Sequence, residues 1–97
     1  MKSIIQEEKT RCYICGKNAS ADYFGLDEHH VFFGYNRKKS EKYGLKVYLC
    51  HNSCHLYGVH KYADLNRKVQ REVQVKAMKH YGWSIEDFRA IFGRNYL

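Results

Sequence analysis

The 97-residue chain contains no proline, one tryptophan and two methionines, and it has no apolar run long enough to cross a membrane. Its first eight residues also lack the apolar stretch of a secretory signal. These absences favour a soluble protein of a reducing, cytoplasmic compartment with no membrane partner. The alternative is a secreted disulfide-bonded fold whose signal has been removed. Without proline and with nine tyrosines, the chain is expected to fold.

Acidic residues are scarce relative to basic ones. The chain has 10 Asp and Glu against 17 Lys and Arg, which gives a formal net charge of +7 with neutral histidines. This excess favours a polyanionic partner, and nucleic acid is the first candidate. Charge alone is weak support, because many basic proteins bind nothing specific.

The length allows one domain, which we expect to span residues 1–97 with residues 1–11 as a flexible lead-in. A chain this short buries a modest share of its surface and often needs a cross-link. Two cysteine pairs offer one: Cys12 with Cys15, and Cys50 with Cys54. Four thiolates from two turns satisfy the tetrahedral preference of a structural zinc ion. The alternative is that all four are buried free thiols.

The secondary structure is expected to begin with two strands. Tyr23–Phe33 is rich in aromatic and β-branched residues and predicts a strand interrupted near Gly25. Gly34–Tyr43 is interpreted as a charged connection. Leu45–Leu49 alternates and predicts a second strand that ends on Cys50. Two such strands followed by a helix form a ββα unit.

A long amphipathic helix is predicted from Lys61 to about Tyr81, ending at Gly82. Its apolar positions recur at spacings of three and four: Tyr62, Leu65, Val69, Val73, Ala77 and Tyr81. Its other face carries basic side chains, which we interpret mainly as a solvated surface: Arg67, Lys68, Arg71, Lys76 and Lys79.

A short last helix is predicted over Ile85–Phe92, with Ser84 as N-cap, Asp87 completing a capping box and Gly93 as the stop. The fold class is therefore α+β: a small ββα core fastened by a four-cysteine zinc site, then a long amphipathic helix and a short C-terminal helix.

Four of the six histidines point to a second metal site. His29 and His30 are adjacent on the first predicted strand, and His55 follows Cys54 directly. Neighbouring residues of a strand point to opposite faces, so His29 and His30 cannot both face one ion. We expect one of them to bind the metal and the other to activate water.

The third metal contact is less clear from spacing. His60 lies five residues after His55, which is about 140° around a regular α-helix, so both bind one ion only if Gly58 breaks the helix. His51 lies four residues before His55 but between two cysteines. We rank His60 above His51.

Over Cys12–His60 the chain resembles the HNH, or His-Me finger, endonucleases with a ββα-metal core, and in particular small zinc-stapled phage and prophage proteins. The resemblance implies metal-dependent hydrolysis of DNA phosphodiester bonds that leaves 5′-phosphate and 3′-hydroxyl ends. It makes His30 the general base and His29 and His55, joined by His60, the ligands of a catalytic Mg²⁺ or Mn²⁺ ion. The zinc ion is then structural.

The same resemblance implies DNA as partner, a phage packaging machine as a further candidate partner and a bacterial host cell as location. The family's middle asparagine has no counterpart at Gly44, Leu45 or Lys46, and Asn36 and Asn52 are the candidates to replace it.

Other interpretations compete with the nuclease. Arg37, Lys38 and Lys39 are expected to clamp DNA phosphates near the site, although they are equally typical of a solvated loop. The chain as a whole is also compatible with a catalytically silent zinc module that binds DNA or a protein. A third possibility is a cysteine-histidine metal regulator. The adjacent pair His29-His30 discriminates best, because a structural zinc finger has no need of it.

Overall fold

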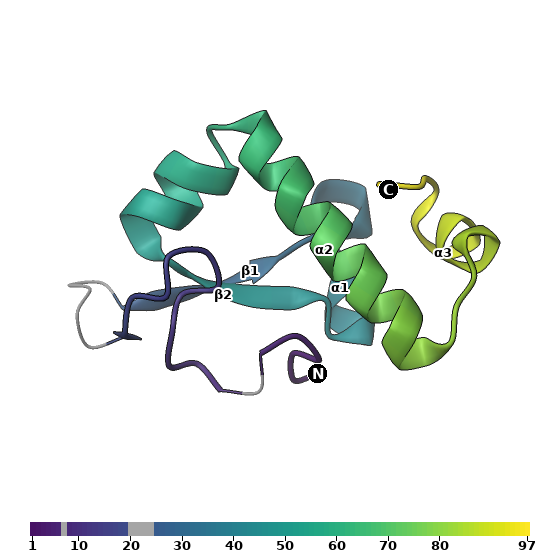
Figure 1. Cartoon of the computed structure of the whole chain (residues 1–97), viewed down its shortest axis with the longest axis horizontal. Coiled ribbons are helices and arrows are strands. Elements are labelled where there is room, and N and C mark those ends of the chain that lie inside the picture. Colours follow the sequence, from purple (N-terminus) through teal and green to yellow (C-terminus); the bar gives the residue numbers. More distant parts are fainter. Residues whose placement is uncertain (7, 20–24) are drawn as a thin grey trace.

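An antiparallel pair of strands lies at the centre of the fold (Figure 1). The computed structural model describes residues 1–6, 8–19 and 25–97. Its elements follow in order: the strand β1 (Leu26–His30), the 3-10 turn η2 (Gly34–Asn36), the helix α1 (Arg37–Tyr43), the strand β2 (Lys46–Cys50), the π-helix η3 (His51–Val59), and the helices α2 (Ala63–Tyr81) and α3 (Ile85–Phe92). The predicted α+β class is confirmed.

The strand register sets the two faces of the pair. Leu26 lies opposite Cys50, and His30 lies opposite Lys46. Because side chains alternate along a strand, Asp27 and His29 share one face of β1, while Glu28 and His30 share the other. The two adjacent histidines are thereby directed into different surroundings, as the alternation predicts.

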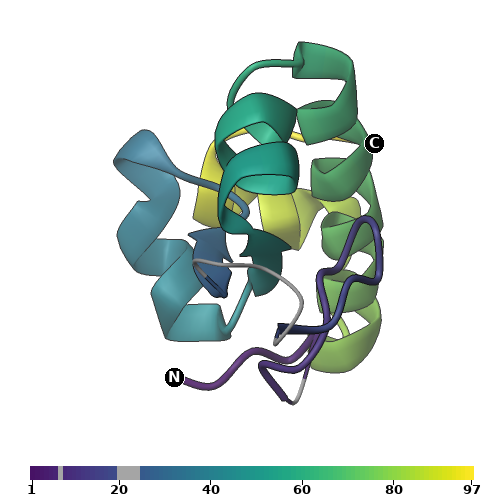
Figure 2. The same ribbon diagram turned by 90° about the vertical axis from the view of Figure 1, so that its left-hand side faces the viewer.

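Helices enclose the strand pair from both sides: α1 lies on one side and α2 on the other (Figure 2). The core forms where α2 and α3 meet the residues that follow β1. Phe32 is 1% exposed, and its ring lies 5.4 Å from that of Phe88 and 5.0 Å from that of Phe92. The helix α2 contributes the buried face that its periodicity predicts through Val69, Val73 and Ala77.

The connection between the strands differs from the prediction. It is no mere charged link, since it contains η2 and the helix α1, which ends at Gly44 in a left-handed conformation. β1 is also shorter than predicted: it ends at His30, and Val31 and Phe32 turn into the core. The predicted strand residues Tyr23 and Phe24 lie outside the described residues.

The helix boundaries agree closely with the sequence. α2 begins two residues later than predicted, because Tyr62 is its extended N-cap and is 56% exposed. Ser84 and Asp87 form the predicted capping box, and the left-handed Gly82 and Gly93 end α2 and α3. Within the described ranges, no helix is both long and apolar enough to span a membrane.

The amino-terminal segment is attached more closely than the expected lead-in. The buried Ser3 hydroxyl donates to the Lys46 carbonyl, and the Ile4 amide donates to the Gly44 carbonyl at 3.0 Å. The Gln6 side-chain oxygen accepts a hydrogen bond from the Tyr48 amide at 2.7 Å. Residues 1–6 therefore add a third, irregular layer along β2.

The close approach of the amino-terminal segment to Gly44 can be tested by substituting this glycine. Gly44 and Gly82 both have a φ of 70°, but a Cβ on Gly44 would lie 2.5 Å from the Lys2 carbonyl oxygen, whereas one on Gly82 meets nothing within 4 Å. Gly82→Ala should cost the left-handed strain alone, about 1 kcal/mol of unfolding free energy. Gly44→Ala should cost about 1–3 kcal/mol more because of the clash. Guanidinium unfolding midpoints measure both, and equal losses would show that the amino-terminal segment does not pack against Gly44.

Candidate metal centres

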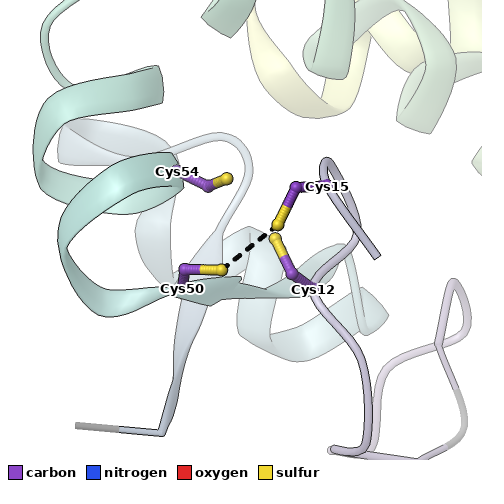
Figure 3. Close-up of side chains that lie close together, drawn as sticks. All are labelled: Cys12, Cys15, Cys50 and Cys54. Carbon is purple, nitrogen blue, oxygen red and sulfur yellow. Dashed lines mark hydrogen bonds between the residues drawn. The ribbon is translucent and has the colours of Figure 1, made fainter. Parts of the chain in front are cut away.

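The four cysteines come together as the sequence predicts. Cys12 and Cys15 lie on the amino-terminal turn, Cys50 ends β2 and Cys54 lies in η3, and all four side chains converge (Figure 3). Their sulfur atoms lie within 4.8 Å of one another, with 3.4 Å between those of Cys15 and Cys50. A tetrahedral zinc ion with Zn–S bonds of about 2.3 Å places its sulfurs about 3.8 Å apart. The cluster is therefore of the right size to hold zinc.

The electrostatics of this cluster favour a bound cation. Burial raises the pKa of Cys12, but hydrogen bonds from backbone amides, first that of Cys15, outweigh it and lower the pKa to about 7. Burial and the neighbouring sulfurs raise the pKa of Cys50 to about 11 and also raise the pKa of Cys54. One thiolate, that of Cys12, is thus stabilised by the backbone, and a cation bound among the sulfurs would favour loss of the protons of Cys50 and Cys54.

Three histidines form the second group. The ring nitrogens of His29, His55 and His60 lie within 4.8 Å of one another, and the Nε2 atoms of His55 and His60 are 3.0 Å apart. We call these residues the histidine trio. His29 comes from β1, His55 from η3 and His60 from the cap that ends η3.

The π-helix explains how His60 joins the trio. The expectation that Gly58 breaks the helix is wrong: η3 continues through Gly58, and the His60 amide donates to the His55 carbonyl at 3.2 Å. That hydrogen bond joins residues five apart, which is the repeat of a π-helix. Residues that stand about 140° apart on an α-helix therefore lie on the same side here.

Asp27 orients the histidine trio through its contact with one member, His55. Its Oδ2 atom lies 2.8 Å from His55 Nδ1 and 2.7 Å from His51 Nδ1. Burial raises the pKa of Asp27, but the hydrogen bonds from His55 and His51 lower it more, so the carboxylate accepts from both rings. The His55 Nδ1–H is thus engaged and its Nε2 lone pair faces His60. A carboxylate behind a ligating histidine is the usual second contact of protein metal sites. His51, in turn, contacts Asp27 and is outside the trio.

His29 fits the role of a ligand. It is 2% exposed, and among the described residues its buried Nε2 atom has no hydrogen-bond partner. Burial, aided by the neighbouring imidazoles of which His55 is the first, lowers its pKa to about 3, so the ring is neutral at neutral pH. A buried polar atom without a partner is costly, and a metal ion bound to that nitrogen would remove the cost. The trio therefore fits a divalent cation, and imidazole donors suit zinc or nickel better than magnesium.

His30 lies on the opposite face of β1, in a different network. Its Nε2 atom is 2.9 Å from Glu41 Oε2, and the Lys46 ammonium bridges Glu41 at 2.8 Å and Glu28 at 3.0 Å. Hydrogen bonds from Lys46, then from His30, lower the pKa of Glu41 to about 2. Because an ionised carboxylate only accepts, the His30 Nε2–H must donate, and in the neutral ring Nδ1 keeps the lone pair.

The two histidine surroundings share one hollow. A depression of about 200 Å³ is lined by His30 and Arg37 together with the whole trio. A neighbouring one of about 420 Å³ is lined by His30, Arg37 and Lys38. Lys39 is directed elsewhere, since its ammonium donates to the Ile91 carbonyl on α3.

Two residues of these networks escape the sequence interpretation. Asp27 is detectable in principle, because it stands two positions before His29 and so shares its face. Glu41 gives no signal, since only the position of α1 brings it to His30. The candidate asparagines do not take this place: Asn36 donates to the Phe92 carbonyl, and Asn52 is exposed.

No family model, curated protein or solved structure matches the chain. The fold and its clusters nevertheless define a class: a small α+β domain with a four-cysteine cluster and a histidine cluster around a β-hairpin. Both clusters are groups that could hold a metal ion.

Removal of metal tests the cysteine cluster. We expect one equivalent of thiolate-bound zinc per chain and a large fall in melting temperature after chelation, because in such sites binding energy is folding energy. Cobalt substitution, read by its thiolate charge-transfer absorption, assigns the ion to sulfur rather than to imidazole. A chelated chain that melts like the zinc-loaded one would contradict a structural zinc.

The histidine trio is tested by nickel titration of the zinc-loaded protein. Calorimetry should find one Ni²⁺ site, and His60→Ala should weaken it at least about tenfold, as loss of a ligand or its support does. His80→Ala removes an exposed imidazole of α2 and serves as the matched control, which should leave the affinity unchanged. Equal affinities for the two variants would exclude His60 as a ligand.

Proposed function

We propose that the chain is a metal-dependent endonuclease of the HNH type that hydrolyses phosphodiester bonds of DNA. The observation that carries the proposal is a single hollow lined by three imidazoles grouped to hold an ion and by a fourth, His30, held in a separate network. The resemblance over Cys12–His60 assigns the same residues to the same roles. The positive net charge favours a polyanionic substrate.

His30 acts as general base in this proposal. Glu41 accepts from Nε2 and fixes the tautomer in which Nδ1 receives a proton. Lys46 is 4% exposed and forms ion pairs with both Glu41 and Glu28, so it offsets part of their negative charge and reduces the repulsion of a phosphate. Water that loses its proton to His30 attacks phosphorus, and the bond to the 3′ oxygen breaks. The departing 3′ oxygen takes up a proton from solvent, so the products carry a 5′-phosphate and a 3′-hydroxyl.

The trio would hold the metal ion of this reaction. His29, His55 and His60 are the residues that would bind a divalent cation, and such a cation would supply charge stabilisation to the reaction. Asp27 keeps the His55 ring turned toward that position. Arg37 borders both hollows and Lys38 borders one, so both are positioned to contact phosphates on either side of the scissile bond.

Loss of the base should abolish most cleavage. General-base catalysis contributes about 10²–10⁴-fold in rate, so His30→Ala should nick supercoiled plasmid at least about 100-fold more slowly. The assay is run separately with Mg²⁺, Mn²⁺ and Ni²⁺, since the resemblance implies the first two and the imidazole donors favour the last.

His80→Ala is the matched control and should cut like the wild type. The melting temperature and DNA affinity of His30→Ala should stay close to the wild-type values, which separates loss of chemistry from loss of fold. Near wild-type nicking by His30→Ala would refute the assignment of the base. Absence of nicking by the wild type with every ion would favour a silent zinc module.

A further inference from the structure

A third hollow neighbours the one that contains the histidine trio. It has a volume of about 440 Å³ and is bordered by Phe33, by Arg67 and Asn66 of α2, and by Arg94 and Tyr96 of the carboxyl-terminal segment. We call it the C-terminal hollow. Phe33 lines both this hollow and the one that contains the trio, so the two are neighbours.

The two residues that follow the exposed Arg94 are held in place by contacts with the core. Gln74 is fully buried, and its side chain donates to Asn95 Oδ1 at 2.7 Å and accepts from the Tyr96 amide at 2.8 Å. The Tyr96 ring packs 4.8 Å from the ring of Phe32 in the core. The Arg94 guanidinium lies 4.6 Å from the centre of the Tyr96 ring and is therefore positioned on a fixed platform.

The charge of the C-terminal hollow is uncompensated. Arg67 and Arg94 border it, and none of the described acidic side chains lines it. Across the described part of the chain, neither guanidinium forms an ion pair with a carboxylate, in contrast to Lys46 with its two glutamates. Two cations that share a hollow without a carboxylate favour a bound anion, and guanidinium groups match phosphate oxygens well.

Phe33 supplies an aromatic surface between the two hollows. It is 42% exposed, and its ring lies 5.3 Å from that of His60 and 5.8 Å from that of His29. An exposed phenylalanine beside basic side chains is the arrangement with which proteins bind unpaired bases, because each base stacks on the ring while the backbone follows the positive charge.

We propose that the C-terminal hollow binds a DNA strand next to the scissile phosphate, with Arg67 and Arg94 on a phosphate and Phe33 stacked on an unpaired base. The inference rests on the proposed function for the identity of the polymer and deepens it by naming the substrate class. Stacking on Phe33 requires a base that has left the duplex, so the preferred substrate is single-stranded or locally unpaired DNA.

Equilibrium binding tests the site without any cleavage. Fluorescence anisotropy of the zinc-loaded protein, with no other divalent ion, compares a labelled single strand with the same sequence as a duplex. Phe33→Leu should lose about tenfold or more in affinity for the single strand and little for the duplex, since stacking contributes about 1–3 kcal/mol per base. Phe33→Tyr keeps an aromatic face and should restore binding.

The two arginines are tested by the salt dependence of binding. Arg67→Gln and Arg94→Gln should each reduce the slope of log affinity against log salt by about 0.7, the value for one lost phosphate contact on a single strand. Arg71→Gln is the matched control, because Arg71 is an exposed arginine of α2 that does not line the hollow. It should change the slope less than either of the others.

The outcomes separate this site from the nuclease activity. If Phe33→Leu binds a single strand like the wild type, or if Arg67→Gln and Arg94→Gln behave like Arg71→Gln, the C-terminal hollow is not a DNA site, whatever the nicking assay gives. If these variants lose binding as expected while the wild type never nicks, the site stands and the endonuclease proposal fails.

Discussion

The convergence of four thiols is the constraint on which the rest of the structure depends. It joins an irregular amino-terminal turn to the end of β2 and to the first turn of η3. A chain of 97 residues buries only a modest share of its surface, so a cross-link at this junction adds to what packing supplies. His51 lies between Cys50 and Cys54 in the chain, and His55 follows Cys54 directly. An interaction that fixes these two sulfur atoms therefore also restrains the imidazoles of His51 and His55.

From that junction the two histidine surroundings follow by strand geometry. Asp27 and His29 face η3, while Glu28 and His30 face α1, so one short strand serves two networks. On the first face burial keeps His29 neutral and Asp27 anchors two rings of η3. On the second, the buried ammonium of Lys46 donates to two carboxylates beside His30, those of Glu28 and Glu41. The sequence Asp27-Glu28-His29-His30 thus alternates between two separate hydrogen-bonded networks.

The sequence predicted those parts of the fold that depend on residues close together in the chain. The cysteine spacing, the period of α2 and the cap at Ser84 each depend on residues a few positions apart, and all agree with the structure. The helix α1 was missed because Arg37–Tyr43 is almost entirely polar, so no apolar period marks it. The pairing of Glu41 with His30 and the turn of Lys39 toward α3 depend on where whole helices pack. The π-helix was missed because its composition gives no distinct pattern, although the five-residue spacing of His55 and His60 was its one visible trace.

The early end of β1 connects the histidine trio with the C-terminal hollow. If the strand continued to residue 33, alternation would direct Val31 and Phe33 to the same face as His29. Instead the chain leaves the strand after His30, Val31 and Phe32 become fully buried, and Phe33 stays partly exposed beside the imidazoles. Phe33 therefore borders the trio on one side and Arg67, Arg94 and Tyr96 on the other, and this one side chain joins the two hollows.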